Sequence, residues 1–237
     1  MPKAIIFDLD NTLVTTSGSR RQAWASVVAA FAAKLEGKDQ QTVLEVLVDT
    51  GDAFWAKTTR TEEDTARKEI IRRSLEQLEI SDASLETDLL DAFVERRQQL
   101  ISLFPGSDAT LVALRSAGVR LALLTNSTAG VEAQRDKIER FALAEHFEHI
   151  QIEGEFGVGK PDPSTFLNVL DVLALQPSDV WMVGDHLEFD VAAAQRLGIC
   201  GIWHDHEGSG LPDDQEIRPD HIITAIPALL ALVGVKL

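Results

Sequence analysis

The sequence is poor in cysteine and contains no long apolar run, and both shortages exclude structural classes. Cys200 is the only cysteine among 237 residues, so an intrachain disulfide and a cysteine-based zinc site are excluded. No apolar run reaches the roughly 18 residues of a membrane-spanning helix. The N-terminal stretch MPKAIIFDLD also lacks the apolar segment and cleavage site of a secretory signal. These observations predict a reducing, cytoplasmic setting without a membrane partner.

Positive charge is scarce as well. The chain has 22 lysines and arginines against 38 aspartates and glutamates, which gives a net charge of −16 at pH 7. This balance argues against nucleic acid or an anionic membrane as the main partner. A small anionic substrate is still compatible, because a bound metal ion or a few cations reverse the field locally. The hydrophobic content of 45% is ordinary for a globular protein.

Two kinds of apolar pattern follow each other along the chain. Residues 3–8 (KAIIFD) form a short apolar run, typical of a strand that is buried on both faces. From Ser19 to about Leu103, apolar residues recur at helical spacing instead, which predicts four helices and no strand. After the break at 104–106 (FPG), strands and helices alternate. The expected strands span 119–125, 149–153, 180–185, 199–203 and 221–226, and the expected helices span 108–117, 128–140, 164–174 and 189–197.

These patterns predict an α/β fold with a doubly wound, mostly parallel sheet, a Rossmann-like core. A four-helix module is inserted between the first strand and the rest of this core. The predicted domains are therefore an α/β core, made of residues 1–14 and 104–237, and a helical insertion of residues 15–103.

Chemically active side chains gather at the carboxyl ends of the predicted strands, where open α/β sheets bind their ligands. In chain order they are Asp8, Asp10, Thr125, Asn126, Lys160, Asp185 and Asp190. Several carboxylates with a hydroxyl, an amide and a lysine at one edge suit a hydrated Mg²⁺ ion that faces a phosphoryl group.

The pair Asp8 and Asp10, in FDLDNTL, raises an electrostatic problem. At a spacing of two residues in a strand, both carboxylates would point to the same side. Like charges held that close repel, and burial adds a desolvation penalty. The strand must therefore end before Asp10, or a positive group must lie between the two carboxylates.

Four segments, taken in order, resemble the four motifs of the haloacid dehalogenase superfamily of hydrolases. They are FDLDNTL (DxDxT), LLTN (a Ser or Thr that ends a strand), the pair Lys160-Pro161, and VGDHLEFD (GDxxxxD). The inserted helices are similar to the small helical cap that this superfamily carries after its first motif. The resemblance therefore spans nearly the whole chain. Within the superfamily, TTSGSRRQAW at 15–24 resembles the N-acylneuraminate-9-phosphatase-like branch.

The resemblance implies a Mg²⁺-dependent phosphatase that works through an aspartyl-phosphate. It implies that Asp8 is the nucleophile, and that Asp10 is the general acid for the leaving alkoxide and then the base for water. Asp8, the backbone carbonyl of Asp10 and Asp185 are expected to hold the metal ion. Asp190, together with Glu188, is expected to hold the waters of that ion, although Glu188 is also read as a structural residue.

The resemblance further implies a phosphoryl-binding set made of Thr125, the backbone around Asn126, and Lys160, which also steadies the nucleophile. Arg20 and Arg21 have two readings. They either recognise a substrate anion or form the solvated first turn of a helix. The expected partner is a small phosphorylated metabolite, and the sequence gives no indication of the oligomeric state.

Two other features suggest different sites and are interpreted as structural. GEFGVGK at 154–160 fits the pattern of a nucleotide-binding P-loop, but Pro161 stands where Ser or Thr should contact Mg²⁺. Proline also removes a backbone N–H from the phosphate cradle, so this reading fails. His204 and His206, in WHDHEGSG, suggest a metal site, but an exposed polar loop is the prediction.

Three alternative functions compete with the phosphatase. A receiver module also uses acids, Thr and Lys around a phospho-aspartate, but it is shorter and carries no inserted helices. Haloalkanoic-acid dehalogenases lack the second aspartate of the first motif, so the presence of Asp10 favours phosphate esters. A phosphomutase on the same core stays open, because it differs in how its cap excludes water.

Overall fold

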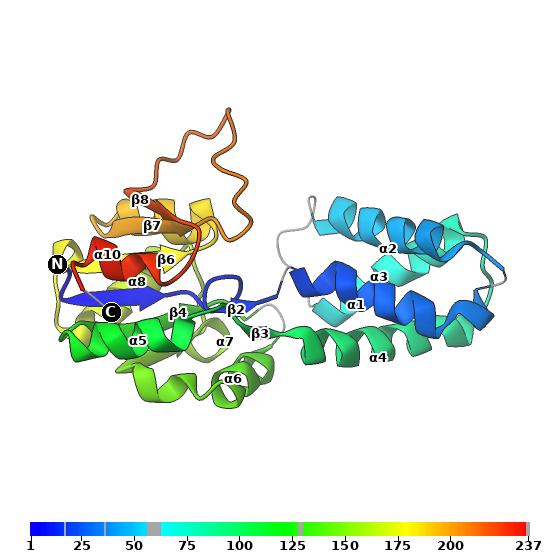
Figure 1. Ribbon diagram of the computed structural model, residues 1–237, viewed down its shortest axis with the longest axis horizontal. Coiled ribbons are helices and arrows are strands. Elements are labelled where there is room, and N and C mark those ends of the chain that lie inside the picture. The colour runs from blue at the N-terminus through cyan, green and yellow to red at the C-terminus, as the bar shows by residue number, and fades with distance from the viewer. Residues whose placement is uncertain (17, 36, 56–62, 128–129, 236–237) are drawn as a thin grey trace. The chain divides into compact units, whose positions relative to one another are not determined.

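The computed structural model describes the chain apart from residues 17, 36, 56–62, 128–129 and 236–237. The chain divides into two compact units. One consists of Met1–Thr15 and Ser102–Leu237, and the other of Thr16–Ile101. Figure 1 follows the chain by colour through both units. Among the described residues, no helix combines the length and apolar character needed to cross a bilayer.

The first unit contains a six-stranded sheet in the order β5-β4-β1-β6-β7-β8, and every neighbouring pair runs parallel. The strands are β1 (Ala4–Phe7), β4 (Arg120–Thr125), β5 (His149–Ile152), β6 (Val180–Gly184), β7 (Cys200–His204) and β8 (His221–Ile223). The predicted α/β fold with a mostly parallel sheet is therefore confirmed. The predicted strand 221–226 is shorter than expected, and Glu153 begins a helix instead of ending β5.

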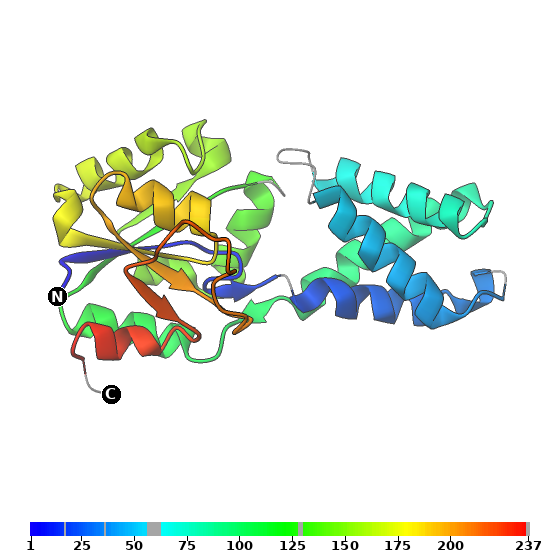
Figure 2. The same ribbon diagram turned by 90° about the horizontal axis from the view of Figure 1, so that it is seen from above.

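Helices cover both faces of this sheet (Figure 2). On one face lie α5 (Ser107–Ser116) and α10 (Ala228–Leu232), and on the other lie α8 (Pro163–Leu173) and the short α9 (Ala193–Gln195). The remaining helical elements of the unit are α6 (Val131–Arg140), η2 (Leu143–His146), α7 (Glu153–Phe156), η3 (Pro177–Asp179) and η4 (Leu187–Ala192). The predicted helix 128–140 thus begins at residue 131 in the structure, and 128–129 lie outside the described residues.

The central strand β1 is buried on both faces, as its apolar run predicts. Ala4 and Ile6 belong to the apolar cluster of the α8 and α9 layer, which also contains Phe166. The alternate side chain of Phe7 packs on the opposite face, edge-on against Phe147 with the ring centroids 6.3 Å apart. Each large apolar side chain buried in this way contributes roughly 1.5–3 kcal/mol. The strand that carries Asp8 at its end is therefore held firmly.

A small antiparallel pair, β2 (Val14–Thr15) and β3 (Ser102–Leu103), was not predicted. Strands of two residues have no periodicity that a sequence pattern could reveal. The pair lies where the chain leaves the α/β unit and where it re-enters it. The Thr15 hydroxyl donates to the Ser102 carbonyl (3.2 Å), and the two side-chain hydroxyls lie 3.1 Å apart.

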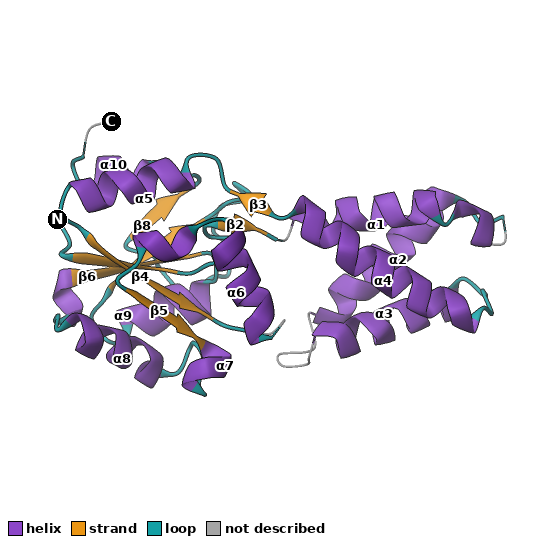
Figure 3. Ribbon diagram, turned by 90° about the horizontal axis from the view of Figure 1, so that it is seen from below, coloured by secondary structure: helices purple, strands orange, loops and turns teal. Residues whose placement is uncertain are grey.

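The second unit is helical (Figure 3). Its main helices are α1 (Gly18–Ala30), α2 (Gln40–Trp55), α3 (Glu63–Gln77) and α4 (Ala83–Leu100), with a short η1 (Ala32–Lys34) after α1. The apolar positions that predict these helices form its core. Trp24 stacks on Phe93 with ring centroids 4.0 Å apart, and Ile71 and Leu89 are at most 1% exposed. The Asp82 carboxylate begins α4 by accepting backbone N–H groups.

Candidate active site

The register of the parallel sheet brings three strand ends to one edge. Phe7 of β1 is level with Leu123 of β4 and with Val183 of β6. Asp8 follows directly after β1, and Thr125 is the last residue of β4. Pairing with the neighbouring strands fixes the positions of Asp8 and Thr125. Both residues therefore lie at the carboxyl edge of the sheet, where a ligand site was predicted.

Three carboxylates meet a single buried lysine at this edge. Asp8, Asp185 and Asp190 each offer an oxygen, and these oxygens lie within 4.8 Å of one another. Lys160 Nζ donates to Asp8 Oδ1 and to Asp190 Oδ1, both at 2.6 Å. Lys160 is only 3% exposed and Asp190 only 1%, so water screens these charges poorly. One ammonium group faces three acids, and the cluster is therefore short of positive charge.

The pKa values reflect this shortage. Burial, with repulsion from Asp190, raises the pKa of Asp8 from 3.8 to about 6, although Lys160 opposes the change. Burial, followed by repulsion from Asp8 and Asp190, raises the pKa of Asp185 well above its ordinary value. Burial alone would lower the pKa of Lys160, but the two carboxylates outweigh this and raise it. A group of this kind suits an additional hard cation.

Asp190 reaches Lys160 because the chain widens around it. A helix was predicted over 189–197, but the structure has the π-helical η4 from 187 to 192 and then α9, so that prediction is wrong in its start and its type. The N–H of Val191 bonds back to the carbonyl of His186 (3.4 Å), while Asp190 Oδ2 accepts the N–H of His186 (3.0 Å). Gly184 makes room for this side chain, because a Cβ there would lie 2.2 Å from Asp190 Cγ.

The loop after β1 is fixed from two sides. Thr12, which is fully buried, donates its hydroxyl to Asp8 Oδ2 at 3.2 Å. His204 donates from Nδ1 to the backbone carbonyl of Asn11 at 3.1 Å. His204 is 1% exposed, and burial lowers its pKa to about 4, so it is a neutral anchor. The prediction that His204 lies in an exposed loop is wrong, because it still belongs to β7.

The side chain of Asn126 bonds to the backbone of Lys160. Its amide donates to the backbone carbonyl of Lys160 and accepts the backbone N–H of Lys160, both at 2.8 Å. This two-way pairing fixes the loop that presents the lysine, next to the cis peptide bond between Lys160 and Pro161. The side chain of Asn126 is therefore engaged with protein, which leaves its backbone as the expected phosphoryl contact. The hydroxyl of Thr125 donates to the Asn126 carbonyl at 3.1 Å.

Asp10 lies outside the three-carboxylate group. β1 ends at Phe7, and the chain has turned by Asn11, whose φ is +59°, so the two acids of FDLDNTL diverge. Each acid has its own lysine. Lys137 Nζ lies 2.5 Å from Asp10 Oδ1, whereas Lys160 contacts Asp8. This arrangement resolves the electrostatic problem that the sequence raised.

Two further residues of this site, Gln134 and Lys137, were missed by sequence reasoning. Both lie on α6, and Gln134 Nε2 donates to Asp10 Oδ2 at 2.9 Å. Residues 131–140 (VEAQRDKIER) are ordinary for an amphipathic helix, and such a pattern does not distinguish a site-facing polar residue from a solvated one. Their spacing of three residues on one helix face was the only signal available.

The remaining candidates have other partners. Arg20 pairs with Asp52 (3.1 Å), and Arg21 pairs with Glu45, both within the helical unit. These contacts resemble ordinary surface ion pairs, and recognition of a substrate anion stays a prediction. Glu188 pairs with Arg196 at 2.8 Å, as its structural reading suggests.

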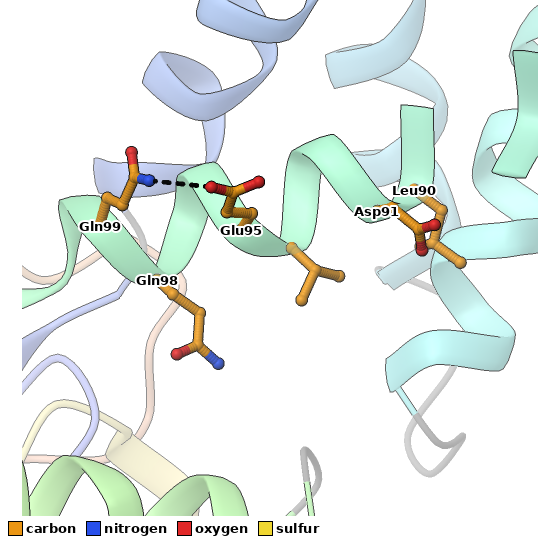
Figure 4. Close-up of a pocket in the computed structure, with 6 residues that line it drawn as sticks. Leu90, Asp91, Glu95, Gln98 and Gln99 are labelled. Atoms are coloured by element: carbon orange, nitrogen blue, oxygen red, sulfur yellow. Dashed lines mark hydrogen bonds between the residues drawn. The ribbon is translucent and has the colours of Figure 1, made fainter. Parts of the chain in front are cut away.

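The helical unit has a surface pocket of its own, of about 460 Å³, on α4 (Figure 4). Gln99 Nε2 donates to Glu95 Oε1 across part of it at 3.3 Å. Its lining residues are Leu90, Asp91, Val94, Glu95, Gln98 and Gln99. None of them belongs to the four motifs, so this pocket is not the candidate site.

The family model for haloacid dehalogenase-like hydrolases matches residues 2–198. An N-acylneuraminate-9-phosphatase from Rattus norvegicus is 30% identical over 244 residues, which cover 99% of this chain and 96% of that protein. A phosphoserine phosphatase from Thermus thermophilus is 39% identical over 134 residues, covering 56% of this chain and 51% of that protein.

Solved structures show the same fold. The magnesium-bound crystal structure of the HAD-hydrolase YfnB from Bacillus subtilis superimposes with a TM-score of 0.75, and the match covers 99% of both chains. At 17% identity this likeness concerns the fold alone. The similarity to the N-acylneuraminate-9-phosphatases extends over the full chain, so the resemblance predicted from the sequence is confirmed.

Proposed function

This chain belongs to the haloacid dehalogenase-like hydrolases and is a phosphatase of that superfamily. We propose that it hydrolyses a small-molecule phosphate monoester with the help of Mg²⁺, through an aspartyl-phosphate on Asp8. The observation that carries the proposal is the buried group of Asp8, Asp185, Asp190 and Lys160 at the carboxyl edge of the sheet. The first substrate to examine is the 9-phosphate of an N-acylneuraminate, on the strength of the full-length relative.

In the proposed reaction, an oxygen of Asp8 attacks phosphorus while the bond from phosphorus to the leaving oxygen breaks. Asp10 gives its proton to that oxygen, and the alcohol departs. A water then attacks the phosphorus of the aspartyl-phosphate and passes a proton to Asp10. The bond from phosphorus to Asp8 breaks, which restores the carboxylate and releases inorganic phosphate. Thr125 and the backbone at Asn126 would orient the phosphoryl oxygens during both steps.

The residues present fit a magnesium ion. Only two of the three acids bond to Lys160, and Asp8 and Asp185 have raised pKa values, which a divalent cation would lower again. Asp8, Asp185 and the backbone carbonyl of Asp10 would hold the ion, and Asp190 would lie behind them, bound to Lys160. Bound there, Mg²⁺ would neutralise charge on the phosphoryl group.

In the metal-free protein, we expect the Asp8 contribution to the free energy of unfolding to decrease as pH rises from about 4 to about 6. The unfolded chain releases this proton near pH 3.8, whereas the folded protein keeps it to about pH 6. Between these values the folded state holds the extra proton, so raising the pH costs stability, in full on the order of 3 kcal/mol. Mg²⁺ should therefore raise the melting temperature more at pH 7.5 than at pH 5, where protons compete for the same carboxylates.

Thermal melts in chelator and in Mg²⁺ at both pH values measure this difference. Asp185→Asn removes one ligand and should diminish the Mg²⁺-induced shift at pH 7.5. Asp179→Asn, which removes an acid from the surface pair with Lys3, should leave the shift unchanged. An equal Mg²⁺ shift at the two pH values would contradict the assignment of these carboxylates to the ion.

The reaction itself is tested with a panel of compounds in Mg²⁺ and in EDTA. The panel contains an N-acylneuraminate 9-phosphate, phosphoserine, a triose phosphate and a 2-haloacid. We expect release of inorganic phosphate from at least one ester, loss of that activity in EDTA, and its return when Mg²⁺ is restored. Full activity in EDTA would refute the metal role. Consumption of the haloacid alone would identify a dehalogenase, and isomerisation without phosphate release would identify a mutase.

The division into a catalytic core (1–14 and 104–237) and a cap (15–103) belongs to the same proposal. We propose that the helical unit admits substrate and then excludes bulk water from the aspartyl-phosphate. Arg20 and Arg21 stay candidates for substrate recognition within it. A cytoplasmic location also remains a prediction, which the single cysteine supports.

A further inference from the structure

Helix α6 gives the site two side chains that none of the four motifs contains. Lys137 Nζ lies 2.5 Å from Asp10 Oδ1, and Gln134 Nε2 lies 2.9 Å from Asp10 Oδ2. The two residues are three apart and project from the same face of the helix. Both oxygens of the Asp10 carboxylate are therefore held by α6, an element that the proposed function leaves without a role.

These contacts differ from an ordinary surface ion pair on the same helix. The side chain of Lys137 is 12% exposed, and Gln134 is 1% exposed. Arg135, on the other side of α6, pairs with Glu155, and these side chains are 45% and 37% exposed. Water and side-chain entropy weaken exposed pairs of that type. The Asp10 carboxylate is instead held between largely buried donors, so its position is better defined.

One end of the Gln134 side-chain amide lacks a hydrogen-bond partner within the described part of the chain. Its Oε1 is buried and has no hydrogen-bond partner among the described residues. An unsatisfied buried oxygen lowers stability and calls for a reason. The reason lies at the other end of the amide, where Nε2 reaches three acceptors. They are Asp10 Oδ2 (2.9 Å), Thr125 Oγ1 (3.3 Å) and the Asn126 carbonyl (2.5 Å).

We propose that Gln134 and Lys137 are positioning residues that hold the Asp10 side chain for its proton transfers. This inference rests on the proposed function, in which Asp10 serves first as acid and then as base. Gln134 also links Asp10 to the phosphoryl-binding hydroxyl of Thr125, because two amide hydrogens serve three acceptors.

The leaving group tests this role. An alkyl phosphate needs a proton on its departing oxygen, whereas p-nitrophenyl phosphate has a leaving group that departs with little help. Breakdown of the aspartyl-phosphate is common to both esters, so the comparison uses kcat/KM, which covers the steps up to its formation. Lys137→Met is expected to lower kcat/KM for the alkyl ester about 10-fold and to change kcat/KM for p-nitrophenyl phosphate by less than about 3-fold. Lys137→Arg should restore most of the loss, because arginine also donates to the carboxylate. Equal losses on both esters would overturn the proposal.

A double-mutant cycle with Asp10 provides the second test. In an Asp10→Asn background, Lys137→Met should change kcat by less than about 2-fold, since the group it positions is already gone. A further loss of about 10-fold in that background would mean that Lys137 acts elsewhere, and the proposal would fail.

Gln134→Leu separates positioning from folding. Leucine has a similar shape and removes the unsatisfied oxygen together with the donor, so the melting temperature should change little while kcat/KM for the alkyl ester falls about 10-fold. A large fall in melting temperature with equal losses on both esters would assign Gln134 a structural role only. Arg135→Met is the matched control on the same helix, and its kinetics should equal those of the wild type.

The outcomes also distinguish this inference from the proposed function. If the wild type releases no phosphate from any ester, or if Asp8→Asn remains active, the proposed function itself is wrong. If the wild type is active and Asp8→Asn is inactive, while Lys137→Met behaves like Arg135→Met, only the positioning role is refuted.

Discussion

Replacing Asp8 with Asn is expected to reduce phosphate-ester hydrolysis by at least about 10⁴-fold and, at the same time, to stabilise the metal-free protein. An amide does not attack phosphorus, so the covalent step is lost. The oxygen of the introduced amide would still accept from Lys160, and the neutral side chain would no longer be repelled by Asp185 and Asp190. Because the pKa of Asp8 is about 6, its ionised form at pH 7.5 costs on the order of 3 kcal/mol, which sets the upper limit of the gain.

Activity assays in Mg²⁺ and urea unfolding in EDTA, both at pH 7.5, measure the two halves of this prediction. The opposite signs are informative, because a variant that merely misfolds loses activity and stability together. Asp179→Asn is the matched control on the surface and should leave activity unchanged. The role of Asp8 as nucleophile would have to be abandoned if Asp8→Asn kept more than about 1% of the wild-type rate.

Replacing Lys160 with Met should have the largest effect on stability. Without the ammonium group, Asp8 and Asp190 remain buried with no cation between them, and removing one partner of such a group typically costs about 3–5 kcal/mol. The loss should be greatest at pH 7.5 in EDTA and smaller at pH 5, because protonation then removes the uncompensated charge. We also expect kcat in Mg²⁺ to fall about 10²–10³-fold, since one contact to the phosphoryl charge is lost.

Lys3→Met provides the control for this change. Lys3 pairs with Asp179 at 3.0 Å, but its side chain is 64% exposed, so its removal should cost no more than about 1 kcal/mol. Urea unfolding of both variants at the two pH values is the measurement. Equal destabilisation by the two substitutions, or a loss that does not depend on pH, would show that the Lys160 cluster is not a buried group short of positive charge.

The parts of the site that could be predicted are those fixed by strand ends. A parallel sheet aligns the carboxyl ends of its strands, so a residue such as Asp8 or Thr125 can be placed from the sequence once its strand is recognised. The order of the four motifs then adds Lys160 and Asp185. The apolar run of β1 is unambiguous because both faces of that strand are buried. Here local pattern and global fold agree.

The parts that could not be predicted depend on tertiary contacts. An amphipathic helix shows which face is apolar, but the polar residues at its border look alike, and Gln134 and Lys137 differ from Arg135 only in what they contact. The π-helical turn before α9 also leaves no trace in the periodicity, because a single widened turn shifts the pattern by only one residue. Within this turn the Asp190 carboxylate accepts the backbone N–H of His186, a contact between a side chain and the backbone that periodicity does not report.

The antiparallel pair of β2 and β3 has a further consequence for the length of the helical insertion. Thr15 and Ser102 are direct partners across that pair, so the two ends of the helical insertion are adjacent. The strands β2 and β3 thus form a hairpin, and the segment that connects them is the whole helical unit. The entropy cost of closing such a hairpin depends only weakly on the length of the segment between its strands. A helical segment of another length at this point would therefore leave the register of β1, and with it the position of Asp8, unchanged.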